Sequence, residues 1–230
     1  MKKLADVAKI VENFDKLGTQ LNSFLEEIDQ RIRKRVEAHK KFSIHENSID
    51  DTDNGDSAWI SVATSLSMPI KVHPNSKSRI YLSFVVELTS KRIAGEQLQA
   101  DLAETPLLHV AISWTRATFS TRGDNYWIID IPPTRAPDEY YELERSDSAL
   151  WVWPKEGFAT ERPFDWKEDS MLFSYPLEVF SGPAEVEKHL VDPLIKILNG
   201  DPPAEALKGV PLLRYQRSDD KSPYSLLVKM

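Results

Sequence analysis

A stripe of apolar residues, spaced alternately three and four positions apart, runs along the start of the chain and constrains its fold most strongly. In an α-helix this spacing places the residues along one side, and the pattern repeats every seven positions. The stripe consists of Leu4, Val7, Val11, Phe14, Leu21, Leu25, Ile28 and Ile32. We therefore predict one long amphipathic, coiled-coil-like helix within residues 1–42.

Gly18 occupies the position of this repeat where an apolar residue is missing. Glycine inside a helix costs about 1 kcal/mol relative to alanine. We therefore expect a bend, a close contact or a short interruption at this residue.

The stripe is narrow and regular, whereas a helix wrapped by a globular core usually has a wider apolar face. We therefore predict that its eight residues form an oligomer interface between copies of the chain. The rival interpretation is that the helix packs back on its own sheet.

Basic residues gather near the C-terminal end of this helix, where cations complement the helix dipole. They are Arg31, Arg33, Lys34, Arg35, Lys40 and Lys41. A solvated helix end is the simpler interpretation, and a phosphate-binding patch is the alternative.

Residues 43–57 follow the helix and are rich in acids and turn formers, so we interpret them as a linker.

From residue 58 onward the apolar pattern changes to alternation, which predicts strands with one buried face. Residues 60–72 and 80–88 form a predicted hairpin whose even-numbered positions face the core. A third strand at 108–114 turns His109 outward, and residues 126–131 are its predicted hairpin partner. Short helices are predicted at 94–104 and 137–145, and strands at 150–153, 171–177 and 224–230.

An apolar face between Pro183 and Gly200 predicts a C-terminal helix, which either kinks at Pro193 or restarts there with Asp192 as its N-cap. The sequence thus predicts an α+β domain over residues 58–230, with a mostly antiparallel β-sheet packed against this helix.

Composition narrows the classes of function. Hydrophobic residues at 41% and charged residues at 28% are close to globular averages, and the net charge of −7 gives no general attraction to nucleic acid. The absence of cysteine fits a reducing compartment, and charged residues interrupt any signal-peptide core. We expect a cytoplasmic protein that neither binds nucleic acid nor enters a membrane.

Motifs for catalysis, metals and nucleotides are weak. The glycines form no phosphate-binding loop, and the five histidines lack the spacing of a zinc site, so we expect no cofactor and no metal. The acid-x-Lys triplet of Asp165 and Lys167, with Asp130, resembles a metal-dependent nuclease pattern, in which two acids bind a cation and a lysine stabilises phosphate charge. Without its structural context such a triplet is weak evidence.

Trp151 and Trp153 lie two positions apart in a predicted strand, so both project from the same face. On the outer face they would form a binding surface for a peptide or small ligand, and on the inner face they are core.

The leading hypothesis is a non-enzymatic protein-interaction or assembly protein that forms homo-oligomers through its N-terminal helix and presents its sheet domain to another protein. The first alternative is a metal-dependent phosphodiesterase or nuclease using Asp130, Asp165 and Lys167. The second is a receptor for a small ligand or peptide built on the two tryptophans.

Overall fold

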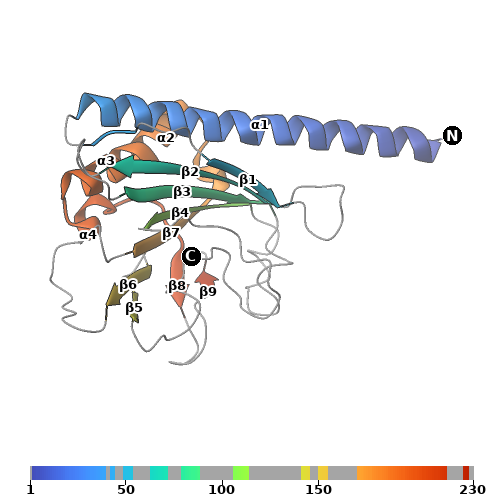
Figure 1. Ribbon diagram of the computed structural model, residues 1–230. Coiled ribbons are helices and arrows are strands. Elements are labelled where there is room, and N and C mark those ends of the chain that lie inside the picture. The colour runs from blue at the N-terminus through green and yellow to red at the C-terminus, as the bar shows by residue number, and fades with distance from the viewer. Residues whose placement is uncertain are drawn as a thin grey trace.

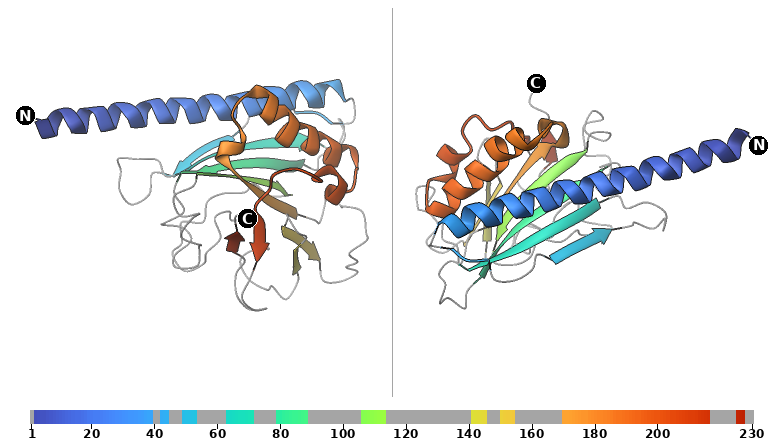
Figure 2. Two further views of the ribbon diagram at one scale, coloured as in Figure 1. Left: turned by 180° about the vertical axis from the view of Figure 1, so that it is seen from behind. Right: turned by 90° about the horizontal axis from the view of Figure 1, so that it is seen from above.

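In the computed structural model, two layers make up the fold: an antiparallel sheet and a layer of helices over one of its faces (Figure 1). The structure describes residues 2–39, 42–44, 49–53, 63–71, 79–88, 106–113, 141–145, 150–154, 170–216 and 225–227. Helix α1 (Lys2–Ala38) crosses the sheet, and the C-terminal helices lie beside it on the same face (Figure 2). The predicted α+β class is confirmed.

The main sheet has seven strands in the order β1-β2-β3-β4-β7-β6-β5, and all neighbouring pairs are antiparallel. The strands are β1 (Ile49–Asp53), β2 (Ala63–Lys71), β3 (Arg79–Glu87), β4 (Leu107–Ser113), β5 (Tyr141–Arg145), β6 (Leu150–Pro154) and β7 (Ser170–Pro176). A separate pair, β8 (Arg214–Gln216) and β9 (Ser225–Leu227), follows at the C-terminal end. Strand β9 confirms a strand in the predicted tail.

The helix-facing side of the sheet is apolar because alternate residues of each strand point to it. One row across four strands shows the register, since Leu66 pairs with Phe84, Phe84 with Val110, and Val110 with Phe173. The predicted inward phase is confirmed at Leu66, Met68, Ile70, Ile80, Leu82, Phe84 and Val86, which all belong to the core cluster. Residues 60, 62 and 72 lie outside the described residues.

The opposite face of the sheet is buried as well, which the alternation did not predict. Ser67 and Ser83 pair across β2 and β3, and their hydroxyl oxygens lie 3.0 Å apart. His109, predicted to face solvent, is 1% exposed, and its Nδ1 lies 2.7 Å from the hydroxyl of Ser174. Strands β8 and β9 lie on this side of the sheet (Figure 1).

The C-terminal helical run contains α2 (Pro183–Val186), a π-helical segment (Glu187–Val191) and α3 (Asp192–Asn199). Gly200 ends it in the left-handed conformation, with φ of 100°. The run continues across Pro193, which a π-helical segment precedes. Asp192 has helical dihedrals, with φ of −58° and ψ of −46°, so it does not restart the helix as an N-cap. A short helix, α4 (Pro203–Ala206), follows.

Three segments differ from their sequence predictions. Residues 141–145 form strand β5, not helical turns, because Tyr141 and Leu143 alternate with glutamates and pair with β6. Strand β1 lies within the predicted linker and pairs with β2. The second neighbour of β4 is β7 rather than residues 126–131, which lie outside the described residues, as do residues 94–104.

Candidate interaction site on helix α1

Helix α1 is one continuous helix of 37 residues, and only part of it lies against the body. Its C-terminal part, residues 17–38, packs over the sheet beside the C-terminal helices, and we call it the docked half (Figure 2). Residues 2–16, which we call the projecting segment, extend past the sheet, and no described helix or strand lies beside them (Figures 1 and 2).

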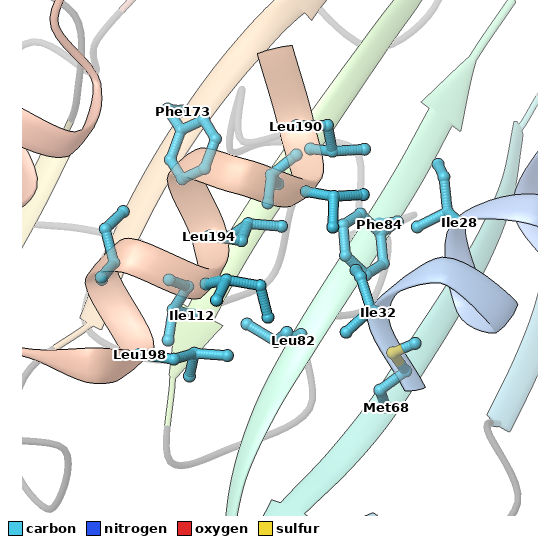
Figure 3. Packing of buried hydrophobic residues seen from close by; sticks show 14 of the residues in the cluster. Ile28, Ile32, Met68, Leu82, Phe84, Ile112, Phe173, Leu190, Leu194 and Leu198 are labelled. Atoms are coloured by element: carbon cyan, nitrogen blue, oxygen red, sulfur yellow. The ribbon is translucent and has the colours of Figure 1, made fainter. Parts of the chain in front are cut away.

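The docked half contributes directly to the hydrophobic core. Its buried residues are Leu21, Leu25, Ile28, Ile32 and Val36. In the view of Figure 3, Phe84 lies between Ile28 and Ile32 on one side and Leu190 of the C-terminal run on the other. Four of the eight predicted interface residues, Leu21, Leu25, Ile28 and Ile32, therefore pack in the chain's own core, which corrects the predicted oligomer interface for this half.

Two further residues explain why the docked half packs on the sheet. Leu17 and Phe24, seven positions apart, flank the stripe and are partly buried against the core. The ring of Phe24 lies 5.6 Å from that of Phe180, measured between centroids. They widen the apolar face, and a wider face suits a helix that covers a globular core.

Ion pairs fix the docked half to the C-terminal run. Arg31 contacts Glu27 at 2.8 Å and Glu187 at 3.2 Å. Arg35 contacts Glu187 at 3.4 Å and Asp192 at 2.6 Å. These side chains are 31 to 42% exposed, so each pair contributes less than about 1 kcal/mol, but together they set the position of α1 along the run.

The basic end of α1 thus differs from the solvated end that the sequence predicts. Arg31 and Arg35 reach the C-terminal run, and Arg33 pairs within the helix with Asp29 at 2.7 Å. The hydrogen bond from Arg31 to Glu27 raises the pKa of the guanidinium, partly opposed by burial. With their charges already paired, Arg31 and Arg35 do not form the alternative phosphate-binding patch.

Gly18 lies at the border between the two parts of α1, and the helix continues through it. The residue is exposed, and a Cβ atom added there would meet no atom within 4 Å. The structure thus shows neither the close contact nor the interruption expected at Gly18.

The C-terminal run is held by Tyr175 of β7, whose hydroxyl donates a 2.6 Å hydrogen bond to the carbonyl oxygen of His189. In an α-helix this carbonyl would accept from residue 193, and Pro193 has no N–H to donate. Tyr175 is fully buried, its ring packs edge-on against Phe173 and Phe180, and burial raises the pKa of its hydroxyl well above its ordinary value.

We expect Tyr175→Phe to lower the free energy of unfolding by about 1 to 2 kcal/mol at pH 8, because it removes this bond. The phenol has a raised pKa in the folded state, so its stabilisation is complete below about pH 10 and is lost as the pH rises further. The difference between wild type and variant, measured by urea unfolding at pH 8 and pH 11, should shrink by about 1.4 kcal/mol. An unchanged difference would contradict this account.

The other candidate residues from the sequence are only partly placed. Strand β6 pairs Trp151 with Met171 and Trp153 with Glu142, but the tryptophan side chains lie outside the described part of the chain. Asp130, Asp165 and Lys167 also lie outside it. The described residues hold no group of three or more His, Asp or Glu side chains suited to a metal ion.

His109 and Ser174 form a Ser–His contact that no sequence motif indicates, since they are 65 positions apart. Both side chains are almost completely buried between β4 and β7. A nucleophile must reach its substrate. The contact is therefore better explained as a hydrogen bond that joins two strands.

The projecting segment of α1 is the candidate functional site, and its part of the stripe consists of Leu4, Val7, Val11 and Phe14.

No protein-family model matches the chain, and no curated protein or solved structure matches it significantly. Among the helices that the structure describes, none is both long and apolar enough to cross a membrane.

Proposed function

We propose that this is a non-enzymatic interaction and assembly protein that self-associates through the projecting segment of α1 in coiled-coil fashion. The observation that carries the proposal is the continuity of α1. The helix rises about 1.5 Å per residue, so its 37 residues span about 55 Å, and its N-terminal part extends past the sheet (Figures 1 and 2).

A partner would stabilise the projecting segment. Most helix stability in proteins comes from packing an apolar face. The projecting segment carries such a face in Leu4, Val7, Val11 and Phe14, which continue the repeat of the docked half. A second copy of the segment offers a matching apolar stripe.

The size of this face indicates a modest affinity. Fully burying a Val, Leu or Phe side chain contributes about 1.5 to 3 kcal/mol, so eight such residues from two chains contribute about 12 to 24 kcal/mol. Association costs about 4 to 15 kcal/mol, and burial in a two-helix pair is incomplete. We therefore expect a dissociation constant on the order of micromolar.

The alternative functions gain no support from the described residues. The nuclease hypothesis rests on Asp130, Asp165 and Lys167, and the receptor hypothesis rests on Trp151 and Trp153. The assembly function needs neither cofactor nor metal, and we place it in the cytoplasm because the chain lacks cysteine.

The test is the effect of Val7→Asp/Val11→Asp on molar mass, measured by light scattering between about 1 and 100 µM. We expect the wild-type mass to rise toward that of a dimer and the variant to stay monomeric, because two carboxylates interrupt the stripe. The matched control, Ala5→Asp/Asn13→Asp, adds the same charge outside the stripe and should behave as wild type. A wild type that is monomeric throughout would contradict the proposal.

A further inference from the structure

We infer that two copies pair with their projecting segments antiparallel, so that the two bodies lie at opposite ends of the helix pair. The inference rests on the proposed self-association and specifies its geometry. Three features of the chain support it: the side of α1 on which the body lies, the length of the projecting segment and the order of its residues.

The position of the body disfavours a parallel pair. The stripe of the docked half faces the chain's own body. A straight helix drifts by about 20° per heptad relative to a seven-residue repeat, so over the two heptads between Val7 and Leu21 the stripe turns by about 40° and stays on the same half of the helix. In a parallel pair the facing stripes would bring both bodies into the space between the helices, whereas an antiparallel pair separates them.

The length of the projecting segment sets the register. Leu17 packs against the core, so a partner helix can lie beside residues 2–16 at most. An antiparallel partner that fills this length ends against the body, and the pair has its centre at residue 9.

The sequence is self-complementary about that same centre. Leu4 and Phe14 lie symmetrically about residue 9, and so do Val7 and Val11. An antiparallel pair therefore places Leu4 against Phe14 of the second copy, and Val7 against Val11, in four apolar layers. The length of the projecting segment and the order of its stripe residues are thus both compatible with a centre at residue 9.

The charges of the projecting segment favour the same orientation. Residues 2–9 carry three lysines and one aspartate, a net charge of +2, whereas residues 10–16 carry Glu12, Asp15 and Lys16, a net charge of −1. An antiparallel pair places each positive half beside the negative half of the other copy. A parallel pair places like charges together, which costs some affinity at low salt.

Disulfide cross-linking tests the orientation cleanly because the chain has no cysteine. The variants are Leu4→Cys and Phe14→Cys in the full-length protein, each oxidised alone and then as an equimolar mixture. In the antiparallel pair, identical positions of either variant lie about 15 Å apart along the axis, beyond the reach of a disulfide. We expect at least a tenfold higher yield of covalent dimer in the mixture than in either variant alone.

The control for random collisions is a mixture of Ala5→Cys and Asn13→Cys, which share the same centre but lie outside the stripe. It should give little covalent dimer. Efficient cross-linking of Leu4→Cys alone would overturn the antiparallel pair in favour of a parallel one. No cross-link in the test mixture, with dimers still present by light scattering, would overturn the register, whereas a monomeric wild type would overturn the proposed function itself.

Discussion

Phe84→Ala is expected to lower the free energy of unfolding by about 3 to 5 kcal/mol, as other aromatic deletions in protein cores do. Phe84 is completely buried in the centre of β3, where Leu66 and Val110 are its cross-strand neighbours. Both α1 and the C-terminal run cover it, so its loss opens a cavity shared by three elements (Figure 3).

Ser83→Ala is the control on the other face of the same strand, and we expect a loss of about 1 kcal/mol. The alternating pattern alone predicts almost no effect there, but Ser83 is buried and its hydroxyl lies 3.0 Å from that of Ser67. Urea unfolding of both variants provides the comparison. Equal losses at the two positions would refute the assignment of the strand faces.

The sheet could be predicted from sequence where alternation is strict. In β2 and β3 the branched and aromatic residues fall on even positions, and a slip of one residue would turn all of them away from the core. The helix-facing side was therefore predictable at Met68, Leu82 and Phe84. Strand β5 was missed because its glutamates resemble helix formers, and it is identified as a strand by its pairing with β6.

The burial of the second face could not be predicted, because serine alone does not distinguish a solvated position from a buried one. The hydroxyls of Ser67 and Ser83 form a hydrogen bond across two strands, and the hydroxyl of Ser174 forms one with the ring of His109. Such contacts depend on how strands from distant parts of the chain align with each other. A local sequence pattern holds no information on this alignment. Small side chains that bond one another allow a polar face to be buried.

The helix was predicted correctly as an element, but its packing was not. The eight-residue stripe omits Leu17 and Phe24, whose partial burial shows that the face is wider than a coiled-coil seam. The ion pairs of Arg31 and Arg35 with the C-terminal run join residues about 156 positions apart, so no local sequence pattern contains them. The border between the docked half and the projecting segment is likewise visible only in three dimensions.

The same substitution at two equivalent positions of the repeat tests the division of α1 into a docked half and a projecting segment. Val7 and Ile28 lie three heptads apart at the same position of the repeat, but Ile28 is completely buried in the core. Ile28→Asp leaves an unpaired carboxylate and a cavity there, so we expect a loss of at least about 4 kcal/mol or failure to fold. Val7→Asp should leave the unfolding of the body unchanged.

The decisive measurement is urea unfolding of these two variants and wild type, followed by circular dichroism at a concentration where the protein is monomeric. We expect a wild-type midpoint for Val7→Asp, and a greatly lowered midpoint or no cooperative transition for Ile28→Asp. Equal effects of the two substitutions, whether both harmless or both damaging, would contradict the division of α1 into a docked half and a projecting segment.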